Sequence, residues 1–358
     1  MNCELNKILV VRFRQMGDAI LSTSLLNTLR RSFPQAEIHF VLNQKIAPLF
    51  EGHPSIDRII TFTDEERHNA LTYIKKVWQT VHQEHYDVII DMRSTMNTML
   101  FALFSPSTKY RIGIRKGYTR LAFNHLLEGC GTNNMVVHDA HLARPLEVEG
   151  KIDYTTDFTL CITDDERNRY KAYLKEKGIN ADKRVMLANV TAKLADKVWN
   201  EERMVEVLDA FIKNHPEVQI IFNFAPGQEE ENALRIYDKL GKPQQVHVDI
   251  KAKSPRELVA LCENITLFFG NEGGARHIAH AAGVPSLVVC APGSNKEVWI
   301  PQNSVPAKGI AASDFASPSE LSAMTRQQQY DLITAEYVKK ELEKFIRNYK
   351  ELEGVRGR

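Results

Sequence analysis

The sequence predicts an α/β protein of two domains, each a doubly wound parallel sheet, which face each other across a cleft. A strand, a short polar turn and a helix follow one another near residue 7 and again near residue 265. Such turns hold ligands because backbone N–H groups at the helix start point at the ligand. Short apolar runs also alternate with helical patterns in both halves of the chain, which is typical of parallel sheets covered on both faces.

Length and composition agree with this fold class. A chain of 358 residues fits two domains of roughly 150–180 residues each. Hydrophobic residues make up 43% and charged residues 25%, and the net charge of +1 gives no overall field that would favour nucleic acid. Five scattered cysteines indicate neither a disulfide framework nor a zinc site, so we expect a cytoplasmic protein. No stretch approaches 18 consecutive apolar residues, and the first residues lack the pattern of a signal peptide, so we expect neither a transmembrane helix nor a signal peptide.

The first half, residues 1–160, is predicted to be one domain. A helix is expected over residues 19–32, where leucines recur at helical spacing. Runs rich in Val, Ile and Phe predict strands at 7–13, 36–42, 58–62, 87–91 and 110–114.

The second half repeats the pattern after a linker. Residues 161–182 predict a polar linker helix, because Thr163 and Glu166 have the spacing of a capping box. The second domain is expected over residues 183–330, with strands at 184–190, 218–224, 244–250, 265–270 and 285–290. A charged amphipathic helix within 331–358 is expected to pack back toward the first domain.

The first candidate site is the turn after the first strand. Gly17 allows a tight turn, and Asp18 falls at or near the start of the following helix. Asp18 is either the helix cap or a carboxylate that could act as a general base. Arg12 and Arg14 either face an anionic substrate or are solvated charges at the strand end. The turn matches neither the dinucleotide fingerprint nor the Walker loop.

The second candidate site is the turn after residue 270. Gly273 and Gly274 precede a helix and could form a nest of N–H groups for a phosphate. Arg276 and His277 would lie in the first turn of that helix, and Glu272 could accept a hydrogen bond from a sugar hydroxyl. The alternative is a tight turn with a structural histidine.

These residues together resemble the family 9 glycosyltransferases, the bacterial ADP-heptose:lipopolysaccharide heptosyltransferases. The resemblance covers most of the chain and rests on motifs in order. They are Met16-Gly17-Asp18 after the first strand, the spacers Phe33-Pro34 and His53-Pro54, Tyr86 to Asp91, Arg111 to Gly113, Lys197-Val198-Trp199, and Gly270 to His277.

The resemblance implies the GT-B fold, with two Rossmann-like domains, and an inverting transfer of a heptose from an ADP-sugar without a metal or other cofactor. Asp18 matches the general base that deprotonates the acceptor hydroxyl. Lys197 and His277 match positions that contact the donor phosphates, and Thr191 is a further donor contact. The N-terminal domain would bind the lipid A–core acceptor, and the C-terminal domain the donor. Neither site region contains an Asp-x-Asp signature.

Two positions depart from the family pattern. Glu272 stands where the family usually has Asp, and Gly273 where Thr is common. These departures leave the donor sugar open, and they keep a non-catalytic nucleotide-sugar-binding homologue as one alternative. The other alternative is a nucleotide-sugar epimerase of the UDP-GlcNAc 2-epimerase type, which shares the acidic-x-Gly-Gly turn.

A basic stretch between residues 109 and 120 would suit an anionic acceptor or peripheral contact with the inner membrane, and a solvated loop is the alternative. Lys197 could likewise be a surface charge, and Trp199 is expected in the core. The cations expected to bind the acceptor are Arg12, Arg14, Arg111, Arg115, Lys116 and Arg120.

Overall fold

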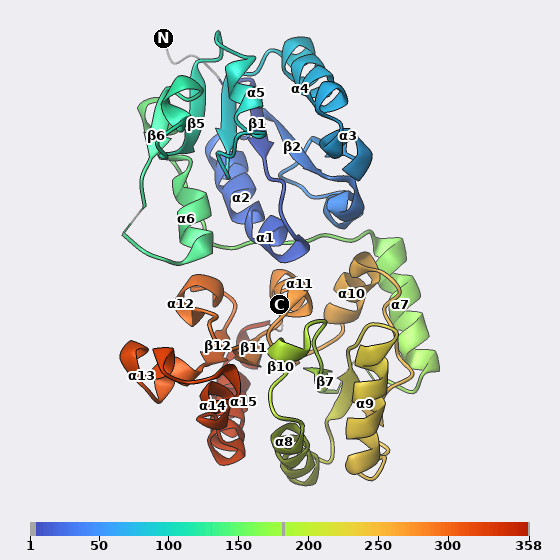
Figure 1. Cartoon of the computed structure of the whole chain (residues 1–358). Coiled ribbons are helices and arrows are strands. Elements are labelled where there is room, and N and C mark those ends of the chain that lie inside the picture. The colour runs from blue at the N-terminus through green and yellow to red at the C-terminus, as the bar shows by residue number, and fades with distance from the viewer. Residues whose placement is uncertain (1–4, 130, 181–182, 357–358) are drawn as a thin grey trace. The chain divides into compact units, whose positions relative to one another are not determined.

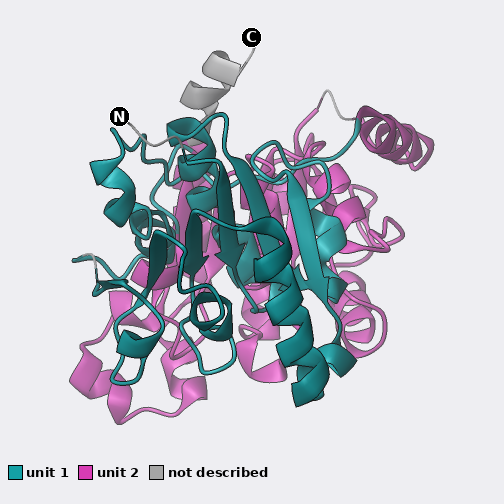
Figure 2. Ribbon diagram, turned by 90° about the horizontal axis from the view of Figure 1, so that it is seen from above, with its two compact units in different colours: residues 1–163, 301–304 teal, residues 164–300, 305–358 magenta. Residues whose placement is uncertain are grey.

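The computed structural model describes residues 5–129, 131–180 and 183–356, so residues 181–182 of the predicted linker lie outside the described residues. The chain divides into two compact units (Figure 2). Unit 1 comprises residues 1–163 and 301–304, and unit 2 comprises residues 164–300 and 305–358. Each unit is an α/β structure around its own sheet.

Unit 1 is built on a six-stranded parallel sheet in the order β3-β2-β1-β4-β5-β6 (Figure 1). In its centre Val10 lies opposite Phe40 on one side and Ile90 on the other. The strands are β1 (Lys7–Val11), β2 (Glu37–Asn43), β3 (Arg58–Phe62), β4 (Val88–Asp91), β5 (Tyr110–Ile114) and β6 (His125–Leu127).

The helices of unit 1 cover the sheet. Tyr73 and Val77 of α4 and Phe101 of α5 pack with Val11 and Phe62 of the sheet in one apolar cluster. The helices are α1 (Met16–Leu21), α2 (Thr23–Ser32), α3 (Asp64–His68), α4 (Ala70–Glu84), α5 (Leu100–Leu103) and α6 (Met135–His141), with short 3₁₀ turns η1 (Gln44–Phe50), η2 (Thr119–Leu121) and η3 (Arg144–Val148).

Unit 2 repeats the architecture with the order β12-β11-β10-β7-β8-β9. Ala188 lies opposite Phe222 and Phe269 in the central strands. The strands are β7 (Val185–Asn189), β8 (Gln219–Phe222), β9 (Val246–His247), β10 (Leu267–Asn271), β11 (Ser286–Val289) and β12 (Ala307–Ile310). The helices are α7 (Asp164–Glu176), α8 (Glu201–Asn214), α9 (Gln228–Lys239), α10 (Pro255–Cys262), α11 (Gly274–Ala281), α12 (Lys296–Trp299), α13 (Pro318–Ser322), α14 (Arg326–Asp331) and α15 (Ala335–Arg356), with η4 (Ala195–Lys197) and η5 (Ala312–Asp314).

Two helices near the predicted domain boundaries have packing partners in unit 2. The helix expected to link the domains, α7, packs against α10 within unit 2, and Arg256 pairs with Glu166 between them. The C-terminal helix α15 packs against α8 in unit 2, where Val338 and Leu342 join the apolar core. That this segment packs back toward the first domain stays a prediction. No described helix, α15 with its 22 residues included, is long and apolar enough to cross a membrane.

The chain also returns to unit 1 once, between α12 and β12, which the sequence did not predict. In this segment Asn303 donates to the Thr156 carbonyl at 3.2 Å, and the Ser304 hydroxyl donates to Asp157 at 2.8 Å. These bonds explain why residues 301–304 belong to unit 1 although both flanking segments belong to unit 2.

Each sheet has one point where the strand order reverses direction. In unit 1 this point lies between β1 and β4, and in unit 2 it lies between β7 and β10. Open parallel sheets bind ligands outside the carboxyl ends of the strands at such points. Both turns singled out in the sequence follow a strand that borders one of these points.

Candidate functional site

The carboxylate of Asp18 lies in the first turn of α1, just after β1. The residue before this helix is Gln15, whose side chain does not cap it, so Asp18 is not the cap. Its Oδ2 lies 3.3 Å from Nε of Arg14, whereas its Oδ1 is buried and has no hydrogen-bond partner among the described residues. The side chain is 12% exposed. Asp18 therefore has one buried carboxylate oxygen without a hydrogen-bond partner among the described residues.

A second arginine near this turn, Arg93, was not predicted. It follows the carboxyl end of β4, the strand next to β1, and donates to the Phe13 carbonyl at 2.9 Å. Burial lowers the pKa of Arg93, and the neighbouring charges of Arg14 and Arg12 lower it further, while Asp18 opposes them. Arg14, Asp18 and Arg93 thus form one charged cluster. Its sequence signal was a cation two residues after the predicted strand 87–91.

Arg12 is buried rather than displayed to a ligand. Its guanidinium donates to the Met92 carbonyl at 3.2 Å and to Asp139 of α6 at 3.3 Å. Arg12 is 2% exposed and the Asp139 side chain is fully buried. We therefore correct the expectation that Arg12 contacts the acceptor: it joins β1 to α6.

The basic stretch after residue 109 is largely engaged by the protein itself. Arg111 donates to the carbonyls of Ser105 and Pro106, and Arg115 pairs with Glu128 at 2.9 Å. These contacts hold the ends of β5.

Two further cations of this stretch differ in their surroundings. Lys116 donates to the carbonyls of Arg93 and Ser94, which fixes the loop after β4. Arg120 is exposed. Arg14 is therefore the predicted acceptor cation that the structure brings next to Asp18, and Lys116 reaches the same edge through the backbone of Arg93.

In unit 2 a pair of buried asparagines builds the second turn. Asn189 at the end of β7 donates to the Asn271 carbonyl at 3.0 Å, and Asn271 donates back to the Asn189 carbonyl at 3.1 Å. The Asn271 side-chain oxygen also accepts from the backbone N–H of Trp199 at 2.8 Å. Trp199 is 1% exposed, so the predicted core position of Trp199 is confirmed. These bonds tie the β7 loop, which carries Lys197, to the start of α11.

Lys197 and Glu272 lie side by side at this edge. The Lys197 ammonium is 3.7 Å from Oε1 of Glu272, and the lysine side chain is 43% exposed while the glutamate is 16% exposed. Gly273 precedes α11 in extended conformation, and a Cβ added there would lie 3.9 Å from the Asn189 amide nitrogen. An exposed cation thus stands next to the amino-terminal end of a helix, where backbone N–H groups are unpaired.

Arg276 and His277 lie in the first turn of α11 and differ in their surroundings. Arg276 is 2% exposed and donates to the Trp299 carbonyl at 2.8 Å, so it joins the start of α11 to the end of α12. Burial lowers its pKa to about 10. Burial also holds the pKa of His277 well below its ordinary value, and the charge of Arg276 lowers it further. His277 is half-buried and neutral, so it can donate one N–H to a ligand but adds no charge.

Thr191 is fully buried after β7. Its hydroxyl lies 3.5 Å from a carboxylate oxygen of Glu229, in the first turn of α9. The structure therefore places it below the surface on which Lys197 lies. In the described part of the chain no three His, Cys, Asp or Glu side chains gather where they could hold a metal ion.

Comparisons with known proteins agree on one family. The model of "Glycosyltransferase family 9 (heptosyltransferase)" matches residues 74–316. The chain is 25% identical over 288 residues to lipopolysaccharide heptosyltransferase 3 of Escherichia coli K12, covering 76% of this chain and 79% of that protein. It is 21% identical over 297 residues to lipopolysaccharide heptosyltransferase 1 of Campylobacter coli, covering 79% and 83%.

Solved structures show the same fold. A family 9 glycosyltransferase from Veillonella parvula has a TM-score of 0.77 at 19% identity, covering 97% of this chain and 100% of that chain. The ADP-heptose heptosyltransferase II of Escherichia coli has a TM-score of 0.70 at 18% identity, covering 96% and 99%. The predicted class, two Rossmann-like doubly wound units of the GT-B type, is confirmed. The family model spans more than half of the chain, and the protein therefore belongs to glycosyltransferase family 9, the heptosyltransferase family, and is a glycosyltransferase.

Proposed function

We propose that this glycosyltransferase transfers a heptose, with inversion and without a metal, from ADP-heptose to a saccharide of the lipopolysaccharide core. The observation that carries the proposal is Asp18, whose Oδ1 lacks a partner among the described residues at the strand-order reversal of unit 1. The relatives are lipopolysaccharide heptosyltransferases, and one similar structure is heptosyltransferase WaaC of Escherichia coli with ADP-2-deoxy-2-fluoro heptose, at 17% identity and a TM-score of 0.67.

In the proposed reaction Asp18 acts as the general base. Arg14 holds Oδ2 of the carboxylate, so Oδ1 accepts the proton of the acceptor hydroxyl. The hydroxyl oxygen bonds to the anomeric carbon of the donor from the face opposite to the leaving group, and the bond from that carbon to the diphosphate oxygen breaks. ADP leaves with the electron pair, and the proton stays on Asp18.

The departing diphosphate is stabilised by groups of unit 2. Lys197 supplies a cation, and the backbone at Gly273 and Gly274 supplies the positive end of the α11 dipole. Neutral His277 donates a hydrogen bond. Arg276 and Thr191 are both buried, so we propose that they support these donor-binding groups from within unit 2.

The acceptor proposed here is carried by a lipid. We therefore propose that the reaction takes place on the cytoplasmic face of the inner membrane, with peripheral contact between protein and membrane. Arg120 is exposed and Arg115 is 49% exposed in its side chain, which supports an electrostatic contribution from these two cations.

Substituting Asp18→Asn tests the proposal. The amide keeps the shape of the side chain but cannot take a proton, so turnover should fall by about 10²–10⁴-fold. The assay measures ADP release from ADP-heptose with a Kdo-terminated lipid A acceptor, with and without EDTA. Binding of ADP by calorimetry should stay unchanged, because the donor groups lie in unit 2.

Asp153→Asn is the matched control. Asp153 is an exposed carboxylate of unit 1 that pairs with Arg31, and its loss should leave turnover unchanged. Full turnover by the Asp18→Asn protein would remove Asp18 as the base. Sugar release or epimerisation by the native protein without any acceptor would contradict transfer itself, and loss of turnover in EDTA would contradict the metal-free reaction.

A further inference from the structure

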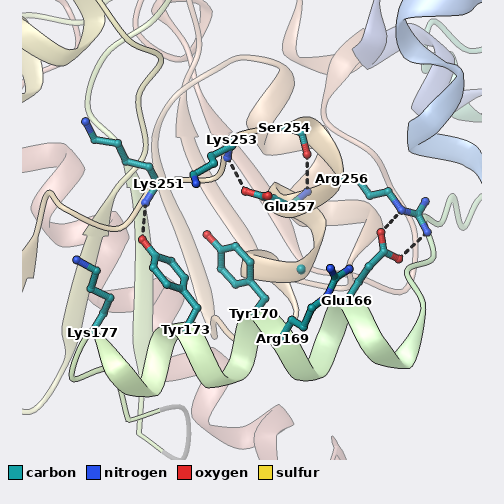
Figure 3. A pocket seen from close by; sticks show the side chains of 11 residues that line it. Glu166, Arg169, Tyr170, Tyr173, Lys177, Lys251, Lys253, Ser254, Arg256 and Glu257 are labelled. Carbon is teal, nitrogen blue, oxygen red and sulfur yellow. Dashed lines mark hydrogen bonds and ion pairs between the residues drawn. The ribbon is translucent and has the colours of Figure 1, made fainter.

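A groove of about 560 Å³ lies between α7 and the segment that leads into α10, within unit 2 (Figure 3). Its volume is in the range of pockets that hold small metabolites. None of its lining residues belongs to β7, β10 or α11, which carry the donor region described above. The groove therefore shares no lining residue with the donor groups proposed above.

The wall of the groove is strongly basic. Five cationic side chains line it against two carboxylates. Three of these cations have carboxylate partners: Arg256 pairs with Glu166, Lys177 with Asp249, and Lys251 with Glu230.

The two remaining cations are Arg169 of α7 and Lys253 of the opposite wall. In the described part of the chain neither forms an ion pair, and both are exposed. Two positive charges without an ion-pair partner among the described residues thus stand on opposite walls of one groove, which the carboxylates of Glu166 and Glu257 also line. Such a pair attracts an anion that enters between them, and hydrogen bonds to charged donors are the stronger kind.

Tyr170 is the second, independent sign of a ligand. Its side chain lines the groove and is 7% exposed, yet its hydroxyl has no hydrogen-bond partner among the described residues. Figure 3 shows this hydroxyl directed from α7 toward the segment that holds Lys253 and Glu257. Native proteins rarely bury a polar group without a partner, and burial raises the pKa of this hydroxyl, so it stays a donor.

The other groups of the groove suit a sugar. Glu257 accepts from the Lys253 backbone N–H at 2.7 Å and retains further acceptor capacity for a hydroxyl group. The rings of Tyr170 and Tyr173 meet edge to face with centroids 5.4 Å apart, and Ala260 adds an apolar wall. Cations for a phosphate, an acceptor for hydroxyls and aromatic surface for a ring occur together.

We propose that this groove binds a phosphorylated sugar, with the phosphate between Arg169 and Lys253 and within reach of the Tyr170 hydroxyl. The groove contains none of the donor groups proposed above. Because α10 packs against α11, a ligand bound in the groove would affect α11, the helix that carries Gly274 and His277.

The test uses calorimetric titration of the full chain with D-glucose 6-phosphate as the probe, in the presence of saturating ADP. Saturable binding alongside ADP is expected. Arg169→Gln combined with Lys253→Gln should weaken it by about tenfold or more, because charged donors are lost. The control Lys171→Gln removes an exposed cation of the same helix that does not line the groove, and it should bind like the native chain.

Tyr170→Phe provides a readout that a purely structural role would not give. Without probe, the variant should melt at the same or a higher temperature, because it removes a hydroxyl that lacks a partner. With probe, it should bind more weakly by about threefold to tenfold, as expected for one lost hydrogen bond.

Three results would overturn the proposal: no binding of the probe at millimolar concentration, displacement of the probe by ADP, or equal affinity for the probe in the doubly substituted chain. Equal affinity for inorganic phosphate or for unphosphorylated glucose would overturn the assignment to a phosphorylated sugar. ADP binding is measured separately in each variant. Loss of probe binding with ADP binding retained would therefore contradict only the groove proposal, and not the proposed transfer reaction.

Discussion

Two glycines near the donor turn have opposite surroundings. Gly270 has φ +133°, and a Cβ added there would lie 2.3 Å from the Asn189 carbonyl oxygen. Gly273 is extended, and a Cβ there would come no closer than 3.9 Å to the Asn189 amide. The first glycine is required by the close approach of β10 to β7, whereas the second has room for a side-chain carbon.

Substitution by alanine should separate these two roles. Gly270→Ala forces a strained backbone and a backbone clash, so the free energy of unfolding should fall by about 3 kcal/mol or more. Gly273→Ala should change it by less than about 1 kcal/mol. Chemical denaturation followed by circular dichroism measures both. Comparable losses in the two variants would show that the approach of Asn189 is not what selects Gly270.

At the scale of elements, one buried ion pair joins a strand to a distant helix. Arg12 follows β1 and Asp139 lies in α6, and both side chains are almost fully buried. Removing one partner leaves a buried charge without compensation. Arg12→Met or Asp139→Leu alone should therefore lower the free energy of unfolding by about 3–5 kcal/mol, and the double variant by less than the sum.

The exposed pair Arg31–Asp153 is the control for this cycle. Its side chains are 50% and 54% exposed, and it joins α2 to the segment after η3 with two hydrogen bonds. Arg31→Met should cost no more than about 1 kcal/mol, because water screens the charges. If the two arginine variants lose equal stability, the buried pair does not hold α6 on the sheet. Activity is measured in parallel, since Arg12 lies next to the turn that carries Asp18.

The same elements show what the sequence could predict. Central strands such as β1 and β10 are continuous apolar runs, so their positions and the turns after them followed from pattern alone. The short edge strands β6 and β12 were not predicted from the pattern. β12 is Ala-Lys-Gly-Ile, which is not an apolar run, and its Gly309 is required by close contacts with Cys290 and Ile300. Local sequence does not display such contacts.

The sequence predicted where the candidate site residues lie along the chain, but not which of them are buried. The sequence located Asp18, Lys197 and His277 at strand ends. It could not show that Arg12 and Arg276 turn inward, because burial of an arginine depends on distant partners, here Asp139 and the Trp299 carbonyl. Arg93 was missed for the same reason, since its place beside Arg14 depends on the pairing of β1 with β4.

At the scale of the whole molecule, each unit has its own core. The cluster around Leu9 and Val11 is built from unit 1, and the cluster around Trp199, Phe269 and Leu342 is built from unit 2. Units with separate cores can open separately, and hydrogen exchange detects such openings segment by segment. A ligand stabilises only the unit whose folded state binds it.

ADP should therefore slow hydrogen exchange in the sheet of unit 2 and leave exchange in the sheet of unit 1 unchanged. At about 100 times its Kd, ADP should slow exchange by global opening about 100-fold in β7 and β10, which corresponds to about 2.7 kcal/mol. Exchange in β1 and β4 should stay unchanged, because the proposed donor groups Lys197, Gly273 and His277 all belong to unit 2. Mass spectrometry of peptides from each sheet measures both in one sample. Equal slowing in the two sheets would show that the units unfold as one, and slowing confined to β1 and β4 would move the nucleotide to unit 1.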